Sequence, residues 1–133
     1  ALLMPNIIIH IISKYYGNIS QSKIINDAQW TAFISMISKE LKNNNIILHK
    51  IFEAKIDGFD PDPFHKKCDN RGPTLCIIEN NLYGFIFGGY TSKSWRNSNK
   101  IREFSKDENA SLYGIYPQMF IMNIKDEYVD MAI

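Results

Sequence analysis

Several features of specialised proteins are scarce in this sequence, and each scarcity excludes a class of protein. The 133 residues include only two cysteines, Cys68 and Cys76, whereas a secreted domain of this size that depends on disulfides usually has more. We therefore expect a reducing, cytoplasmic environment. Lysine and arginine number 15 against 14 aspartates and glutamates, so no overall charge attracts the chain to nucleic acid or to an acidic membrane.

Long hydrophobic runs are also lacking. The most apolar stretch, residues 2–12, is interrupted by Pro5, Asn6 and His10 and is shorter than the roughly 20 apolar residues that a spanning helix needs. It has neither the basic flank nor the small-residue cleavage site of a signal peptide. We predict a buried strand or helix here and no direct insertion into a membrane. Residues 1–22 as a whole are expected to be an N-terminal segment or the tail of an upstream region.

A helix is predicted to begin after Asn26, whose side chain is placed to accept a backbone N–H. Gln29, three residues later, completes a capping box. Apolar residues then recur at helical spacing and form one stripe, which is typical of a helix that packs on its own core. The stripe consists of Trp30, Phe33, Ile34, Ile37 and Leu41. The three asparagines at residues 43–45 are expected to end the helix.

The next segment predicts a strand followed by a short helix. Residues 46–54 are rich in β-branched and aromatic side chains, which favour a strand. Asp60 followed by Pro61 is typical of a helix start, and this second helix is expected to extend through Cys68.

A β-hairpin is predicted from residues 74–79 and 82–87, which flank Asn80-Asn81. Asparagine tolerates the positive φ that a tight hairpin turn demands. Gly88-Gly89, at the end of the second strand, indicates a bulge or a close backbone approach.

The remaining segments indicate a loop and further strands. Residues 92–111 are rich in Ser, Asn, Lys and Glu and predict a long surface connection. Residues 119–124 return to a strand pattern, and residues 128–133 resemble the start of another strand. Several separated strands with two helices imply an α+β domain dominated by antiparallel sheet.

His65, Cys68 and Cys76 are the candidates for metal binding or thiol chemistry. Imidazole and thiolate are ligands that Zn²⁺ prefers, but the spacing matches no closed zinc site, and a fourth ligand is not evident. A Cys-His catalytic pair would also need a third group to orient the base. We therefore expect buried, structural cysteines and no cofactor.

A basic stretch offers a candidate surface for single-stranded nucleic acid. It contains Lys93, Trp95, Arg96, Lys100 and Arg102. Charge combined with aromatic stacking would suit such a ligand, but Glu103, Asp107 and Glu108 dilute the positive charge. A solvated loop that binds no nucleic acid is the better interpretation.

Three stretches of sequence resemble a known family. Residues 52–59 read Phe-Glu-Ala-Lys-Ile-Asp-Gly-Phe, residues 64–75 read Phe-His-Lys-Lys-Cys-Asp-Asn-Arg-Gly-Pro-Thr-Leu, and residues 86–95 read Ile-Phe-Gly-Gly-Tyr-Thr-Ser-Lys-Ser-Trp. In this order they resemble the TLDc domain, and most closely the TLDc proteins of unicellular eukaryotes and fungi, which are related to the oxidation resistance proteins. The resemblance places a TLDc-like domain at residues 23–133.

The resemblance implies a fold, an antiparallel two-sheet β-sandwich with flanking helices. TLDc domains normally continue, past the position of Ile133, into a glycine-rich segment with the pattern Gly-Pro-x-Phe-Gly and further strands. This sequence has no such segment. We therefore expect a domain that lacks its C-terminal part or that completes its sheet with another chain.

The resemblance also implies a function without catalysis. Several animal and fungal TLDc proteins protect cells from oxidative damage and bind the vacuolar proton-pumping ATPase, and no accepted catalytic residues accompany that role. We expect a non-enzymatic protein-interaction module that uses the exposed loop residues Arg71, Lys93, Trp95 and Arg96. Two alternatives are a structural subunit of a larger assembly and a peroxide-reactive enzyme that uses Cys68 or Cys76.

Overall fold

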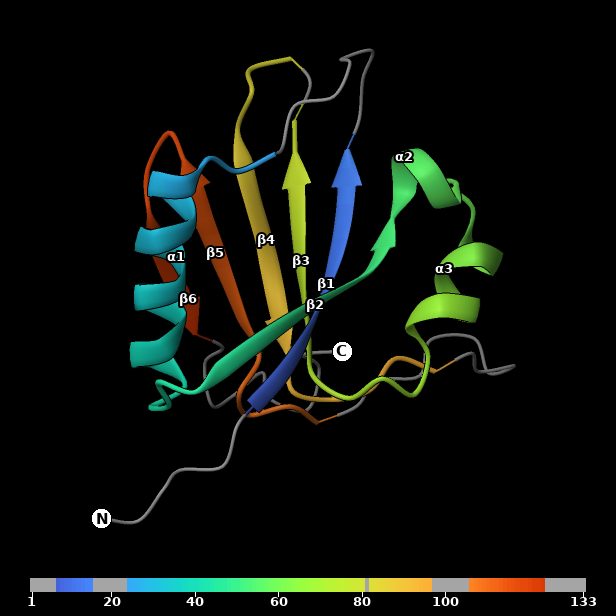
Figure 1. Cartoon of the computed structure of the whole chain (residues 1–133), viewed down its shortest axis with the longest axis horizontal. Helices are drawn as coiled ribbons and strands as arrows, with labels where there is room; N and C mark the ends of the chain where they lie inside the picture. Colours follow the sequence, from blue (N-terminus) through green and yellow to red (C-terminus); the bar gives the residue numbers. More distant parts are fainter. Residues whose placement is uncertain (1–6, 16–23, 81, 97–105, 124–133) are drawn as a thin grey trace.

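The computed structural model describes residues 7–15, 24–80, 82–96 and 106–123, with the backbone alone for residues 7–15. Within these residues, six strands form one sheet with the order β2-β1-β3-β4-β5-β6 (Figure 1). The strands are β1 (Ile7–Tyr15), β2 (Ile46–Glu53), β3 (Thr74–Glu79), β4 (Ile86–Thr91), β5 (Ser111–Tyr116) and β6 (Phe120–Asn123). The helices are α1 (Asp27–Glu40), α2 (Ala54–Asp57) and α3 (Pro61–Cys68).

The sheet is mixed in direction. β1 runs parallel to both β2 and β3, whereas β3, β4, β5 and β6 pair antiparallel in sequence order. The predicted combination of helices and strands is therefore confirmed, and the predicted antiparallel pairing is confirmed for β3 to β6 but not for β1. The predicted two-sheet sandwich is not confirmed, because the described strands all belong to a single sheet.

β1 lies inside this sheet, between β2 and β3, so of the strand or helix predicted in residues 2–12 the structure has a strand, over Ile7–Tyr15. The predicted division into residues 1–22 and 23–133 stays a prediction. The strand expected in residues 128–133 lies outside the described residues.

The predicted start of α1 is confirmed in detail. Asn26 Oδ1 accepts a hydrogen bond from the Gln29 backbone N–H at 2.8 Å, and Gln29 Oε1 accepts one from the Asn26 N–H at 3.0 Å. Both halves of the capping box are therefore present. Phe33 and Ile37, from the predicted stripe, are the buried residues of this helix.

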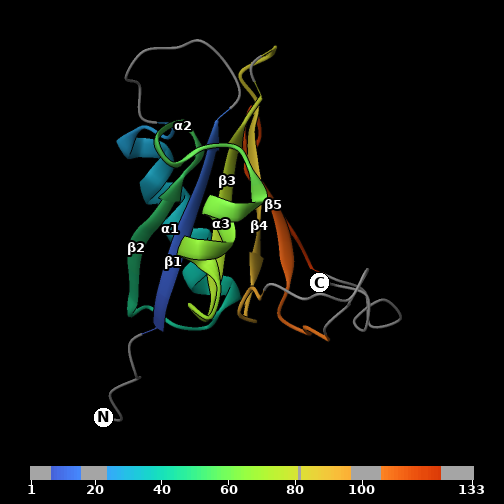
Figure 2. The same cartoon turned by 90° about the vertical axis from the view of Figure 1, so that its right-hand side faces the viewer.

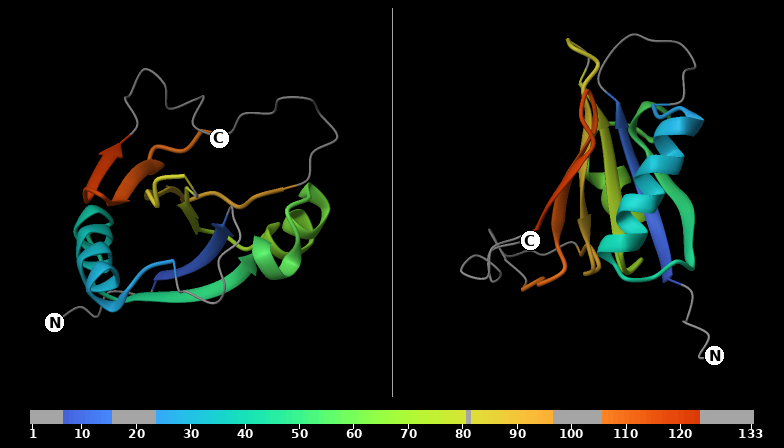
Figure 3. Two further views of the ribbon diagram at one scale, coloured as in Figure 1. Left: turned by 90° about the horizontal axis from the view of Figure 1, so that it is seen from above. Right: turned by 90° about the vertical axis from the view of Figure 1, so that its left-hand side faces the viewer.

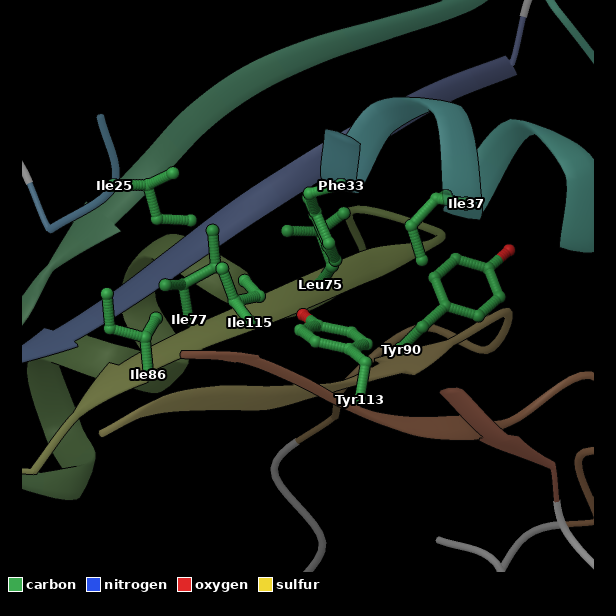
Figure 4. Packing of buried hydrophobic residues seen from close by; sticks show 9 residues of the cluster. All are labelled: Ile25, Phe33, Ile37, Leu75, Ile77, Ile86, Tyr90, Tyr113 and Ile115. Carbon is green, nitrogen blue, oxygen red and sulfur yellow. The ribbon is translucent and has the colours of Figure 1, made fainter. Parts of the chain in front are cut away.

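The main core lies between α1 and one face of the curved sheet (Figure 4). Seen from above, the sheet bends so that α1 lies between β2 and β6 (Figure 3). The rings of Phe33 and Tyr113 lie 4.8 Å apart, and the Tyr113 hydroxyl donates hydrogen bonds to the carbonyl oxygens of Cys76 and Gly89. The helix and three neighbouring strands are thereby joined through one side chain.

Gly88 makes this arrangement possible. A Cβ atom at Gly88 would lie 2.9 Å from Tyr113 Cε2 and would collide with the carbonyl oxygen of Cys76. The predicted close backbone approach is confirmed here. The register irregularity of β4 lies slightly earlier, between Ile86 and Phe87.

The tight turn predicted at Asn80-Asn81 is wrong. β3 ends at Glu79 and β4 begins at Ile86, which is paired with Glu79, so the connection is a longer loop. Asn80 Oδ1 accepts hydrogen bonds from the N–H groups of Leu82 and Tyr83 at 2.9 and 3.2 Å. Gly84 supplies a positive φ of 68°, which glycine adopts without steric cost.

Candidate functional site

Part of the sequence motif lies on the sheet face opposite α1, where α2 and α3 pack (Figures 2 and 3). Its residues form a second apolar cluster, here called the α3 cluster. Its members are Phe52, Ala54, Phe64, Cys68, Cys76 and Trp95, with Ile51 packed beside them. The Phe64 ring meets the rings of Phe52 and Trp95 edge-on, each at 5.5 Å. Much of the motif is therefore architectural.

Trp95 belongs to this cluster and is half-buried, so the expectation of an exposed Trp95 is wrong. Its indole Nε1–H donates a hydrogen bond to Thr74 Oγ1 at 2.9 Å, and Thr74 is only 1% exposed. Buried indole N–H groups usually find such a partner. Trp95 therefore anchors its own segment to the start of β3.

Two backbone segments pair at this end of the sheet. The Asn70 N–H donates to the Trp95 carbonyl at 2.9 Å, and the Gly72 N–H donates to Ser94 Oγ at 2.8 Å. Gly72 has a φ of 78°, a backbone conformation that favours glycine. The turn that contains Arg71 thus lies beside residues 93–96.

Three exposed cations lie on these paired segments, Arg71, Lys93 and Arg96. We call this surface the basic edge. The Arg71 Nε–H donates to the Lys67 carbonyl at 3.2 Å, which holds the guanidinium near the end of α3. The structure therefore pairs the segment that carries Arg71 with the segment that carries Lys93, Trp95 and Arg96.

Carboxylates near the basic edge are engaged elsewhere. Asp57 Oδ1 lies 2.6 Å from Lys67 Nζ, and Asp57 Oδ2 accepts the Glu53 N–H at 2.8 Å. The hydrogen bond from Lys67, with help from the Glu53 N–H, lowers the pKa of Asp57. Asp69 Oδ1 lies 2.8 Å from His65 Nδ1. Both carboxylates therefore have a partner on α3.

The two cysteines lie behind this surface and differ in exposure. Cys68 is fully buried, and burial, with Cys76 nearby, raises the pKa of its thiol to about 12. It is therefore a thiol at neutral pH. Cys76 is only half-buried and packs against the α3 cluster, so the expectation of a buried cysteine holds for Cys68 and only in part for Cys76.

No metal site is evident in the part of the chain that the structure describes. There, no group of three or more His, Cys, Asp and Glu residues could hold an ion. His65 lies against Asp69 instead of forming a pair with Cys68. Among the described helices, none has the length and apolar character needed to cross a bilayer.

Asp107 is the main residue that the sequence did not reveal. It falls in the segment predicted as a surface connection, yet its side chain is fully buried. Its Oδ2 accepts hydrogen bonds from Thr91 Oγ1 at 2.7 Å and the Ser92 N–H at 2.9 Å. Its Oδ1 accepts from Ser92 Oγ at 2.6 Å and the Asn109 N–H at 3.1 Å.

We call these contacts the Asp107 clamp. Burial alone raises the pKa of Asp107, but the hydrogen bonds from Ser92 and Thr91 outweigh that effect and hold the pKa below its ordinary value. The charged carboxylate thus fixes the end of β4, from which Lys93 and Arg96 follow. In the sequence, only the two adjacent hydroxyl residues Thr91 and Ser92 at the end of a strand could have indicated a buried acidic partner.

Among known protein families, the model of the TLDc domain family matches residues 18–133. The chain belongs to the TLDc domain family. In this TLDc domain, the motif residues form the α3 cluster, the paired segments and the close approach at Gly88.

The chain is also similar to the MTOR-associated protein MEAK7 of Danio rerio. It is 30% identical over 69 residues, which cover 52% of this TLDc chain and 14% of MEAK7. The match thus spans a small part of the length of that protein.

Proposed function

We propose that this TLDc domain is a non-enzymatic protein-interaction module and that the basic edge is its contact surface. The observation that carries the proposal is the placement of Arg71 beside Lys93 and Arg96 by paired backbone segments. Three exposed cations on paired segments suit an acidic protein surface, because charge complementarity speeds association and disfavours wrong partners. The half-buried Trp95 does not offer a free ring for stacking on nucleic-acid bases.

The proposed partners are subunits of the vacuolar proton-pumping ATPase, in a cytoplasmic protein that helps to protect a eukaryotic cell from oxidative stress. Membership of the TLDc family supports this proposal. The similarity to a protein named for its association with MTOR supports a role that depends on protein partners. A relationship to the oxidation resistance proteins, and to TLDc proteins of unicellular eukaryotes and fungi, belongs to the same proposal.

The absence of catalysis is also proposed, and the state of Cys68 supports it. A peroxide-reactive cysteine must be an accessible thiolate, whereas Cys68 is buried and has a raised pKa. The test is a Cys68→Ser, Cys76→Ser double variant assayed for protection of cells from peroxide. Full protection is expected, and loss of protection in a folded double variant would favour the enzyme.

Affinity capture of the full-length protein from cells tests the proposed partner and surface together. The variant reverses two charges of the basic edge, Arg71→Glu with Lys93→Glu. A matched control, Lys39→Glu with Lys42→Glu, makes the same change of net charge at exposed positions at the end of α1. We expect recovery of pump subunits to fall about tenfold for the edge variant, which is about 1.4 kcal/mol, and to stay unchanged for the control.

Two outcomes would contradict different parts of this proposal. If the unaltered protein recovers no pump subunits, the named partner is wrong. If both variants recover as much as the unaltered protein, the basic edge is not the contact surface.

A second candidate function is supported by the sheet face opposite α1. Over β4, β5 and β6 this face carries large apolar side chains that are exposed, here called the open face. They are Phe87 (43%), Leu112 (60%), Phe120 (43%) and Met122 (54%). A groove of about 640 Å³ runs between β3 and β6 along it.

Exposed apolar areas of this kind commonly mark an interface. We propose that a second sheet, the one expected for a TLDc sandwich, covers the open face, either from this protein or from another chain of an assembly. Light scattering and the fluorescence of an apolar dye test this with the 133-residue chain. A monomer that binds no dye would contradict a need for such cover.

A further inference from the structure

Ser94 presents an exposed hydroxyl on the paired segments. Its Oγ accepts the hydrogen bond from the Gly72 N–H at 2.8 Å. Among the serines and threonines whose side chains the structure describes, the exposed ones are Thr31, Ser35 and Ser94. Thr31 and Ser35 belong to α1, whereas Ser94 lies outside the described helices and strands. Of these three hydroxyls, that of Ser94 is therefore the one that an enzyme meets in a loop.

The neighbouring hydroxyls are already engaged in the Asp107 clamp. Thr91 Oγ1 and Ser92 Oγ donate hydrogen bonds to the Asp107 carboxylate at 2.7 and 2.6 Å. Thr91 is also buried, and Ser92 is half-buried. Ser94 Oγ, in contrast, accepts one hydrogen bond and donates none within the part of the chain that the structure describes. Its proton can therefore be replaced without breaking the clamp.

Cations flank Ser94 along the chain and across the paired segments. Lys93 precedes it and Arg96 follows two residues later, while Arg71 adjoins Gly72, whose N–H is bonded to Ser94 Oγ. All three cations are exposed. Protein kinases select their substrates partly by the charges around the acceptor hydroxyl. The charges here suit a kinase that has an acidic substrate groove.

We propose that Ser94 is phosphorylated by a serine/threonine kinase of this kind and that the phosphate switches the basic edge off. The phosphoryl donor is a nucleoside triphosphate. The bond between its γ-phosphorus and the bridging oxygen to the β-phosphate breaks, a bond from the γ-phosphorus to Ser94 Oγ forms, and the nucleoside diphosphate leaves. The hydroxyl proton passes to the catalytic base of the kinase.

A phosphate at Ser94 changes both the charge and the contacts of the basic edge. Phosphoserine carries a charge of about −2 at pH 7 and has three acceptor oxygens. These oxygens can accept the Gly72 N–H and add a charge-assisted bond from the Arg71 guanidinium. The charge of the edge falls from about +3 to about +1, which weakens its attraction for an acidic surface. This weakening, unlike the modification itself, rests on the function proposed above for the basic edge.

Mass spectrometry of the full-length protein tests the modification. The protein is isolated from cells treated with an inhibitor of serine/threonine phosphatases. Ser35 is the matched control, because it is also exposed but lies on α1. We expect phosphate on Ser94 at an occupancy at least about fivefold above that on Ser35. A Ser94 peptide without phosphate, or equal occupancy at the two serines, overturns the proposal.

Phosphorus NMR tests the contact between the phosphate and the cations. Phosphoserine is introduced genetically at position 94 or at position 35 of the full-length protein, and its second pKa is titrated. Nearby cations favour the dianion and hold this pKa below its ordinary value of about 6. We expect a lower pKa at position 94 than at position 35, and Arg71→Gln should raise the value at position 94 by about 0.5 unit or more. Equal pKa values at the two positions overturn the switch.

Affinity capture with the same proteins separates this proposal from the proposed function. Phosphoserine at position 94 should lower the recovery of captured partners about tenfold, whereas phosphoserine at position 35 should not. Unchanged recovery with phosphoserine at position 94, where Arg71→Glu with Lys93→Glu abolishes capture, overturns the switch. If that charge reversal leaves capture unchanged as well, the function proposed for the basic edge is wrong, and phosphate occupancy alone then decides whether Ser94 is a modification site.

Discussion

The two faces of the sheet differ in how this chain covers them. Leu112 and Tyr113 are neighbours in β5, but Leu112 is 60% exposed on the open face and Tyr113 is 1% exposed under α1. Successive side chains of a strand point to opposite faces, so both faces are apolar at this strand. The comparison teaches that apolar character marks a surface to be covered, whereas the position of α1 decides which face of β5 is covered here.

The largest difference between the faces should appear when the covered face loses a central ring. Phe33→Ala removes the α1 ring that packs on Tyr113. We expect the free energy of unfolding to fall by about 3–5 kcal/mol, as for other buried aromatic residues. Urea denaturation monitored by circular dichroism measures this. A loss below about 1 kcal/mol would mean that α1 does not close this face.

Adjacent glycines allow a smaller, matched comparison of the two faces. Gly88→Ala places a methyl group against Tyr113 and the Cys76 carbonyl, whereas a Cβ at Gly89 would meet Leu112 Cδ2 and the Ser111 carbonyl at 3.3 and 3.4 Å. We expect Gly88→Ala to cost about 1–3 kcal/mol or more through overpacking. Gly89→Ala should cost much less, because the side chain of Leu112 can move. Equal losses in thermal unfolding would contradict the close approach at Gly88.

Acid should weaken the hydrogen bonds of Asp107, which hold the end of β4 and the start of β5. Because the pKa of Asp107 is lower in the folded protein, its charged form contributes stability above its unfolded pKa of about 4, and that contribution is lost as the pH falls through the folded value. Asp107→Asn should cost about 1–3 kcal/mol at pH 7, because the amide cannot accept all the same hydrogen bonds. Urea denaturation at pH 7 and pH 3 checks both points. A variant with the same acid sensitivity as the unaltered protein would refute the role of this carboxylate.

The smallest effect is expected on the open face. Leu112→Thr should change the free energy of unfolding of the 133-residue chain by less than about 0.5 kcal/mol, because an exposed side chain has little packing to lose. It should also lower the fluorescence of a bound apolar dye. A loss above about 1 kcal/mol would indicate that Leu112 is already covered.

Local patterns made most of the fold predictable. The Asn26 capping box and the apolar stripe of α1 depend on residues three or four positions apart, and both were found. β5 was missed because Gly114 interrupts its pattern. The structure gives the reason for this glycine, since a Cβ there would collide with the Phe120 ring on β6. The loop that replaces the tight turn depends on the Asn80 side chain, which local propensity did not indicate.

The candidate site was less predictable, because its contacts join distant residues. Arg71, Lys93 and Arg96 were identified as exposed cations, but their proximity results from bonds such as that between Gly72 and Ser94, 22 residues apart. Trp95 was assigned to the exposed surface because nothing near it in sequence marks Thr74 as its partner. Asp107 was overlooked for the same reason, since Thr91 lies 16 residues away.

The Asp107 clamp also affects how the chain tolerates changes of length. Because the carboxylate ties the end of β4 to the start of β5, we expect the two strands to keep their positions when the number of residues between Arg96 and Lys106 changes. The entropic cost of closing a longer connection grows only with the logarithm of its length. This connection is therefore a place where sequence can be inserted, in evolution or in the laboratory, without disturbing the sheet or the basic edge.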